Sequence, residues 1–148
     1  MTGLFYEDFQ VGAHFAHAGE HTITEKENLA FCAMTENNQP LHIDSDFARQ
    51  SPFGRRIVNG LLTLGLVVGL SVEELTAGTI VANLGYESIK HPKPVFHGDT
   101  IKAETDVLEK RESKSKDDRG IVRLKQIGRN QAGEIVVEIE RSVMVFKK

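Results

Sequence analysis

The stretch that most constrains the fold is Gly60–Leu75, where nearly every residue before Glu73 is apolar or glycine. A helix that is hydrophobic on all sides has to be covered by other elements. Gly65 and Gly69 lie four residues apart and would leave a groove where a curved sheet can approach closely. The apolar run of residues 61–70 is far shorter than the ~20 residues that span a bilayer. We therefore expect a buried central helix inside a sheet.

The rest of the chain is rich in strand patterns. A weak alternation predicts a short first strand at His14–Ile23, and stronger patterns between Asp-, Gly- and Asn-containing turns predict four more: Ile80–Ile89, Thr100–Glu109, Gly120–Arg129 and Glu134–Phe146. One long helix followed by a meander of strands indicates an α+β fold with an antiparallel sheet wrapped around the helix. With no linker or low-complexity tract, residues 1–148 suit a single domain.

A shorter helix is expected ahead of the central one. Thr24 and Glu27 have the spacing of a capping box, and the helix that they start should run to about Thr35. Pro40 biases the residue before it away from helix, so the first helix should end near there. One further helical turn is expected at residues 45–49, capped by an Asp or Ser side chain.

Residues 36–60 carry the chain's only dense cluster of potential chemistry. His42 lies among Asn, Asp and Gln residues on a loop between two helices, and catalytic groups are usually carried on such loops. Asn59 is a good N-cap for the central helix. Gly60, the first residue of that helix, lets a ligand approach the backbone closely.

This segment resembles the hydratase motif of the MaoC-like, (R)-specific enoyl-CoA hydratases. The residues that carry the resemblance are Asn37-Asn38-Gln39-Pro40-Leu41-His42, then Phe47-Ala48, then Ile57-Val58-Asn59-Gly60. The family motif reads roughly G-D-x-N-P-L-H, then an A, then I-V-H-G at the head of the central helix of a hotdog fold. Asn37 stands where the family has its catalytic Asp, Gln39 where it has Asn, and Asn59 where it has His. A second family segment resembles residues 94–100, so the resemblance covers nearly the whole chain.

The resemblance implies an acyl-CoA hydratase or dehydratase that acts on 2-enoyl-CoA or 3-hydroxyacyl-CoA thioesters and needs no metal or other cofactor. It also implies pairing of two copies, with the acyl-CoA tunnel at their interface. The resemblance implies three catalytic residues. The Gly60 N–H donates to the thioester oxygen and stabilises its negative charge, and His42 and Asn37 hold the water. The residues expected to bind substrate are Gln39, Pro40, Asn59, Arg55 and Arg56.

Asn37 leaves the proton transfers open. An amide can orient a water but cannot exchange protons near pH 7, whereas histidine is the residue type suited to general acid and base catalysis there. Either His42 serves both steps, or a carboxylate such as Glu36 or Asp44 substitutes, or the chain is not a hydratase. The resemblance is more specific to the single-domain branch related to mesaconyl-CoA hydratase (β-methylmalyl-CoA dehydratase). Substrates of that branch carry an extra carboxylate, which would either bind Arg55 or Arg56 or help to orient the water.

Composition narrows the remaining classes of function. A net charge of −3 and a pI of about 6.1 give no basic field for nucleic acid or an anionic membrane. Cys32 is the single cysteine, which excludes an intrachain disulfide and a cysteine-rich metal site. Acidic residues follow Met1 too soon for a signal peptide, so we expect a cytoplasmic protein. The alternatives are a non-catalytic acyl-CoA-binding protein, a thioesterase, and one subunit of a heteromeric hydratase.

Overall fold

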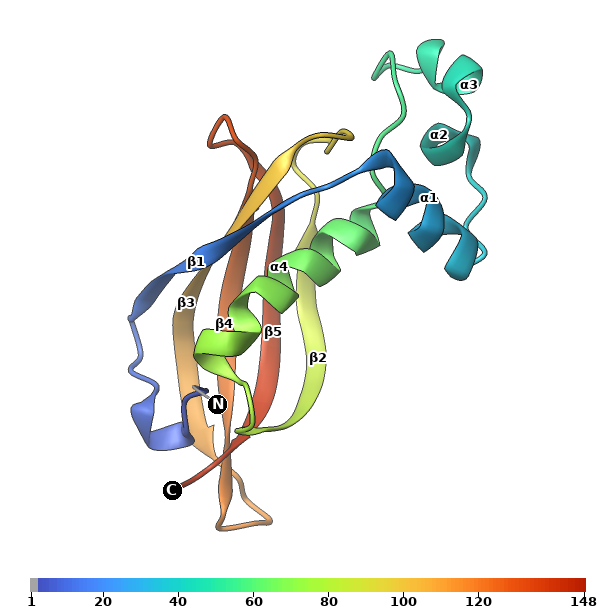
Figure 1. Ribbon diagram of the computed structural model, residues 1–148. Coiled ribbons are helices and arrows are strands. Elements are labelled where there is room, and N and C mark those ends of the chain that lie inside the picture. Colours follow the sequence, from blue (N-terminus) through green and yellow to red (C-terminus); the bar gives the residue numbers. More distant parts are fainter. Residues whose placement is uncertain (1–2) are drawn as a thin grey trace.

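Five strands form one antiparallel sheet in the computed structural model, which describes residues 3–148. In chain order they are β1 (His14–Thr22), β2 (Ile80–Lys90), β3 (Thr100–Glu112), β4 (Arg119–Arg129) and β5 (Ile135–Phe146). Their order in the sheet is β1-β3-β4-β5-β2, so β1 and β2 are the two edges. The sheet curves around the long helix α4 (Gly60–Leu75), as Figure 1 shows. The expected hotdog arrangement is confirmed.

The core lies between α4 and the concave face of the sheet. Val67, on the inner face of α4, packs with Ile101 of β3 and Val137 of β5, and all three side chains are fully buried. The closest approach falls on Gly128 of β4, where an added Cβ would come within 2.5 Å of a Val67 methyl group. A glycine in the sheet therefore lets the helix sit down on it.

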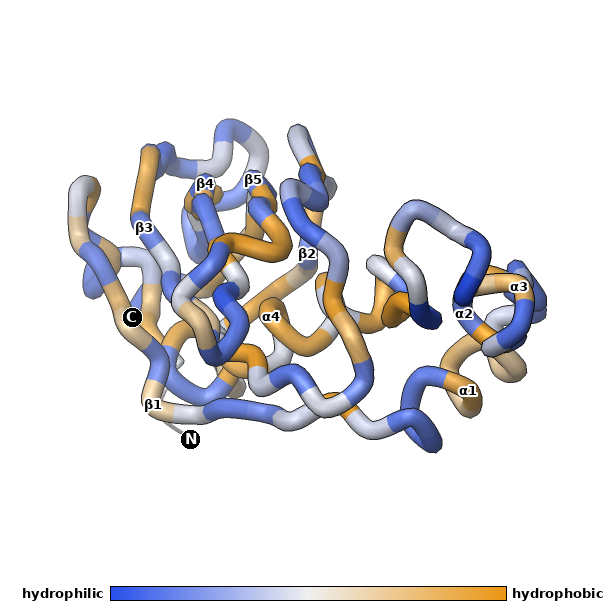
Figure 2. The backbone as a smooth tube through the Cα atoms, turned by 90° about the horizontal axis from the view of Figure 1, so that it is seen from above, coloured by the Kyte–Doolittle hydropathy of each residue, from blue (hydrophilic) through white to orange (hydrophobic). Residues whose placement is uncertain are grey.

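Two expectations about α4 are wrong for the isolated chain. Its outer stripe is exposed, with Leu61 57% and Val72 40% accessible, so the helix is not buried on all sides. Gly65 and Gly69 lie on that same stripe, and an added Cβ at either position would meet nothing within 4 Å. These glycines face away from the sheet because the apolar residues between them already supply the inward face. In Figure 2, much of α4 has the orange colour of hydrophobic residues.

Three short helices lie beyond the N-terminal end of α4, beside the sheet (Figure 1). They are α1 (Glu25–Met34), α2 (Pro40–Ile43) and α3 (Ser45–Arg49). The Thr24–Glu27 capping box is confirmed, since the Glu27 N–H donates to Thr24 Oγ1 at 3.1 Å and the Thr24 N–H to the Glu27 carboxylate at 3.2 Å. Pro40 does more than follow a helix end, because it is the first residue of α2, where its missing N–H costs nothing.

The remaining elements are short or agree closely with the sequence patterns. A 3₁₀ turn, η1 (Tyr6–Asp8), precedes β1, and β4 and β5 pair as a hairpin whose turn contains Gly133 at φ +77°. Asp44 caps α3 by accepting from the Asp46 and Phe47 N–H groups, as expected. Within residues 3–148, no helix has the length and apolar character needed to cross a membrane.

Candidate active site

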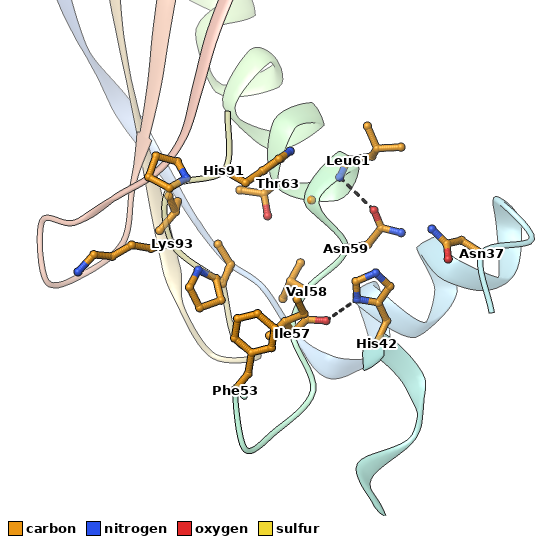
Figure 3. A pocket seen from close by; sticks show the side chains of 15 residues that line it. Asn37, His42, Phe53, Ile57, Val58, Asn59, Leu61, Thr63, His91 and Lys93 are labelled. Carbon is orange, nitrogen blue, oxygen red and sulfur yellow. Dashed lines mark hydrogen bonds between the residues drawn. The ribbon is translucent and has the colours of Figure 1, made fainter. Parts of the chain in front are cut away.

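A cavity of about 500 Å³ lies at the N-terminal end of α4. Its walls come from the start of α4, the connection between β2 and β3, and the segment that carries His42 (Figure 3). Asn37, His42 and Gly60, the three predicted catalytic residues, all line it. The other lining residues are Phe53, Ile57, Val58, Asn59, Leu61, Thr63, His91, Pro92, Lys93, Pro94, Val95 and Val136. None of the lining residues that the structure describes is an Asp or Glu.

The backbone fixes the tautomer of His42. Its Nδ1 lies 2.9 Å from the Ile57 carbonyl oxygen, which can only accept, so Nδ1 carries the proton (Figure 3). In the neutral ring Nε2 then bears the lone pair and can act as a base. The Ile57 N–H donates to the Leu41 carbonyl at 3.3 Å, which ties this carbonyl to α2. Ile57 thus holds both the His42 ring and the backbone just before it.

Asn37 presents donors to the cavity. Its Oδ1 accepts the Gln39 N–H at 3.3 Å, and its own N–H donates to the Cys32 carbonyl at 2.9 Å. The amide NH₂ has no partner among the hydrogen bonds of residues 3–148, so it can donate to a ligand in the cavity. Glu36, just before it, has a φ of +59°, a conformation that glycine adopts most readily. This is the position at which the family motif has its Gly.

Within residues 3–148, the start of α4 leaves the Gly60 N–H without a hydrogen-bond partner. Asn59 caps the helix, as predicted, since its Oδ1 accepts the Leu61 N–H at 3.0 Å. The Asn59 carbonyl accepts from the next two N–H groups of the helix. The Gly60 N–H precedes these and lies at the positive end of the helix dipole. The Asn59 side chain is 3% exposed and serves the helix end.

Asn28 of α1 connects the parts of the site, and sequence reasoning missed it. It is fully buried, and its Oδ1 accepts the Asn59 N–H at 2.9 Å. Its NH₂ group lies 3.0 Å from His97 Nε2 and 3.4 Å from the His42 carbonyl. An asparagine four residues inside a capped helix was the available signal, but its partners are distant in sequence.

Of the predicted substrate-binding residues, only Asn59 is among the described residues that line the cavity. Gln39 lines an adjoining hollow of about 570 Å³ with Leu41 and Phe47, and Phe53 lines both spaces. Pro40 lies at the head of α2 and sets the turn that delivers His42.

The two arginines lie in a separate hollow of about 310 Å³ that also contains Arg49 and His97. The Arg55 guanidinium lies 3.7 Å over the Phe96 ring, and Arg56 pairs with Glu25 at 2.9 Å. Burial lowers the pKa of His97, and the charge of Arg56 lowers it further.

Neither carboxylate considered as a substitute acid lines the cavity. Asp44 accepts two N–H groups at the start of α3, and Glu36 is exposed on the turn after α1. Three polar side chains that sequence reasoning did not select do line it: Thr63, His91 and Lys93. For Thr63, the signal was its place one turn after Gly60 in an otherwise apolar helix. For His91 and Lys93, the sequence gave no sign of proximity to α4.

Comparison with known proteins assigns this chain to a family. Residues 8–130 match the family model described as MaoC like domain. The chain is 36% identical over 146 residues to mesaconyl-CoA hydratase of Cereibacter sphaeroides, covering 99% of this chain and 42% of that protein. It is 32% identical over 146 residues to β-methylmalyl-CoA dehydratase of Chloroflexus aurantiacus, covering 99% and 41%.

A solved structure has the same extent as this chain. The MaoC-like dehydratase from Rhodospirillum rubrum superposes with a TM-score of 0.88 at 34% identity, covering 99% of both chains. By contrast, the chain spans less than half the length of the two curated relatives. The family model covers residues 8–130, which is most of the chain and includes the cavity residues from Asn37 to Val95. This chain belongs to the MaoC-like domain family.

Proposed function

We propose that this protein adds water reversibly across the 2,3-bond of an enoyl-CoA thioester. The observation that carries the proposal is a histidine with a bare Nε2 in the same cavity as the first N–H of a long helix. A base and an oxyanion donor facing one space are what hydration of an α,β-unsaturated thioester needs. The family relatives named as hydratase and dehydratase support the same reaction in its two directions.

In the hydration direction, His42 Nε2 removes a proton from water as the water oxygen bonds to Cβ. The electrons of the double bond shift toward the thioester carbonyl, whose oxygen gains negative charge. The Gly60 N–H, aided by the helix dipole, stabilises that charge. The proton on Nε2 then passes to Cα, which gives the 3-hydroxyacyl thioester and restores neutral His42. The Ile57 carbonyl supports the transient imidazolium through Nδ1–H.

Asn37 orients the water in this proposal. Its NH₂ group donates to the water oxygen and leaves a water proton directed at His42. Since an amide cannot take that proton, His42 carries both transfers. The Glu36 and Asp44 carboxylates lie away from the cavity and take no part.

The CoA portion would leave the cavity past Phe53. This ring lines both the main cavity and the hollow with Gln39, so a long ligand can run from one to the other. Arg55 and Arg56 lie on the same connecting segment and would hold a phosphate of CoA. The cytoplasmic location expected from the sequence stays a prediction.

We also propose a homodimer formed along β2. This edge strand exposes Leu84, Tyr86 and Ile89, each at least 40% accessible, and an unpaired strand edge with apolar side chains favours association. The exposed stripe of α4, including Leu61 at the cavity, adds further apolar surface that a second copy would cover. A second copy beside β2 would border the cavity and form a tunnel.

The reaction is tested by incubating the purified protein with a panel of enoyl-CoAs and 3-hydroxyacyl-CoAs. Hydration, dehydration and release of free CoA are followed separately. We expect hydration and dehydration without CoA release, and His42→Ala should lower kcat/KM by about 10²–10⁴ while acyl-CoA binding is retained. His14→Ala, at a surface histidine paired with Asp106, is the matched control.

Other outcomes point elsewhere. Release of free CoA would identify a thioesterase, and binding without turnover would identify a carrier or a subunit that needs a partner. Turnover that survives His42→Ala would remove the central residue of the mechanism.

A further inference from the structure

His91 lines the cavity and takes no part in the proton transfers. It is exposed, and its two ring nitrogens have no hydrogen-bond partner within residues 3–148. Figure 3 shows it beside Thr63 at the first turn of α4, across the cavity from His42. A neutral imidazole has one N–H and an imidazolium has two, so His91 can donate a hydrogen bond to a ligand in either state.

The connection between β2 and β3 holds His91 against the start of α4. The next residue is Pro92, which favours extended backbone at His91 and so limits its conformations. Further along the connection, the Val95 carbonyl accepts the Val58 N–H at 2.7 Å, which ties this connection to the segment that leads into Gly60. The imidazole is therefore in place before a substrate binds, as electrostatic stabilisation of a developing charge requires.

The His91 ring and the Gly60 N–H are close enough to share one acceptor atom. A Cβ placed on Gly60 would lie 3.1 Å from His91 Nε2 and 3.2 Å from His91 Nδ1. Because a Cβ lies about 2.5 Å from the nitrogen of its own residue, both ring nitrogens are within about 5.7 Å of the Gly60 nitrogen. An oxygen that accepts two N–H groups at about 2.9 Å each can join nitrogens up to about 5.8 Å apart. The separation therefore allows one oxygen to accept from both.

We propose that His91 is a second oxyanion donor, whose ring N–H binds the thioester oxygen together with the Gly60 N–H. The inference rests on the proposed hydratase function and adds a catalytic residue to that reaction. The thioester oxygen gains negative charge as water adds to Cβ, and a second donor aimed at this oxygen lowers the barrier further. His91 keeps its proton throughout, so both proton transfers stay with His42.

The carbonyl group of a bound thioester reports this contact without any turnover. Butyryl-CoA has no double bond to hydrate, and the stretching frequency of its carbonyl group falls as hydrogen bonds to the oxygen strengthen. Infrared difference spectra of the protein with ¹³C=O-labelled and unlabelled butyryl-CoA isolate this one band. The frequency in each variant is then compared with that in the wild type.

His91→Phe separates hydrogen bonding from packing, because phenylalanine fills the same space without an N–H. We expect the bound carbonyl group to absorb at a higher frequency in this variant than in the wild type. His91→Asn places an amide NH₂ group near the position of Nδ1, and His91→Gln places one near Nε2. One of these two variants should restore the wild-type frequency and so identify the ring nitrogen that donates. A frequency raised equally in all three variants would indicate a displaced ligand and overturn the assignment.

Hydration of crotonyl-CoA measures what the donor contributes to the reaction. A hydrogen bond that strengthens as the oxygen becomes charged acts mainly on kcat, so His91→Phe should lower kcat by about 10²-fold and change KM little. His14→Phe is the matched control, because it makes the same substitution at a surface histidine paired with Asp106. It should change neither kcat nor the carbonyl frequency.

The two measurements separate this inference from the proposed reaction. A carbonyl frequency that rises in His91→Phe and returns in the Asn or Gln variant would support the second donor even in a protein that hydrates no enoyl-CoA. An unchanged frequency in His91→Phe would overturn the inference whether or not kcat falls. The hydratase proposal would still stand in that case if the wild type hydrates crotonyl-CoA.

Discussion

At the scale of single residues, the site is defined by which atoms can exchange a proton. His42 has its Nδ1–H engaged by the Ile57 carbonyl, so only Nε2 is available. Asn37 has one lone pair of its oxygen engaged by the Gln39 N–H, and its NH₂ group can donate but cannot take a proton. No described lining residue is a carboxylate, and His91 and Lys93 come from the β2–β3 connection on another wall, so in our proposal the proton moves through His42.

Replacing Asn37 by Asp tests this division of roles. In Asn37→Asp, one carboxylate oxygen can keep the Gln39 N–H while the other reaches the cavity and shares proton transfer. We expect hydration to be faster, by up to about 10²-fold, with a pH profile that gains a carboxylate limb. The neighbouring Glu36 should raise the pKa of the new carboxyl group through like charge and move that limb upward.

Steady-state kcat/KM measured across pH checks this result. Asn38→Asp places the same charge one residue away, outside the cavity, and should not change the rate. A slower enzyme in Asn37→Asp would show that the amide donors matter more than a second acid.

At the scale of elements, Asn28 links α1, the start of α4 and the β2–β3 connection. The Asn59 N–H can only donate, so the Asn28 oxygen must face it. The Asn28 NH₂ group must then face His97 Nε2, which has to present a lone pair. Protonation of His97 would place its Nε2–H against the Asn28 NH₂ group, and both groups are donors. This conflict should lower the pKa of His97, as burial and the charge of Arg56 already do.

This geometry predicts how stability depends on pH. The folded-state pKa of His97 lies below its ordinary value of 6.5, so as pH falls the unfolded chain binds the proton first. The free energy of unfolding should decrease below about pH 6.5, and the loss is complete only below the folded pKa. His97→Gln keeps an acceptor for Asn28 and binds no proton, so its unfolding free energy should fall less.

Urea unfolding at about pH 7 and about pH 5 measures the difference, and an NMR titration of His97 gives its pKa directly. A His97 pKa above 6.5 would contradict the orientation assigned to the Asn28 amide. Equal acid sensitivity of the wild type and His97→Gln would contradict the link to stability.

Local patterns were enough to predict much of the fold. The capping box at Thr24, the cap at Asn59 and the alternating strands depend on neighbours in the sequence, and all of them were confirmed within a few residues. Contacts between distant segments were not predictable in this way. Asn28 is buried only because three other segments meet it, and Thr63 faces a cavity only because the helix is rotated to bury Val67.

The error at Gly65 and Gly69 has the same origin. Two glycines four apart are compatible with close packing or with an open face, and the choice depends on the rotation of α4. The sheet approaches the helix through Gly128 of β4, and the two helical glycines are left on the exposed stripe. A helix with apolar residues on every side gave no local signal for that rotation.

At the scale of the whole molecule, the β2 edge of the sheet exposes large apolar side chains that the described fold does not cover. The inner faces of the sheet and α4 bury each other, whereas β2 lies at the edge with Leu84, Tyr86 and Ile89 exposed. The connection that follows β2 carries His91 and Lys93 into the cavity. Association along β2 would therefore cover these apolar side chains and also change the shape of the site.

A charge on this edge should separate the copies. Leu84 is 49% exposed, so Leu84→Lys can leave the fold of one chain intact, while a lysine at a paired edge opposes association. We expect light scattering at micromolar concentration to show a dimer for the wild type and a monomer for Leu84→Lys. Turnover should fall with the dimer fraction, because the open cavity then admits bulk water to the reacting centre.

Val11→Lys is the matched control, since Val11 is 60% exposed in the turn before β1, outside the β2 edge. It should remain dimeric and active. A strictly monomeric wild type would remove the proposed interface, and a monomeric Leu84→Lys variant with full activity would show that one chain holds the complete site.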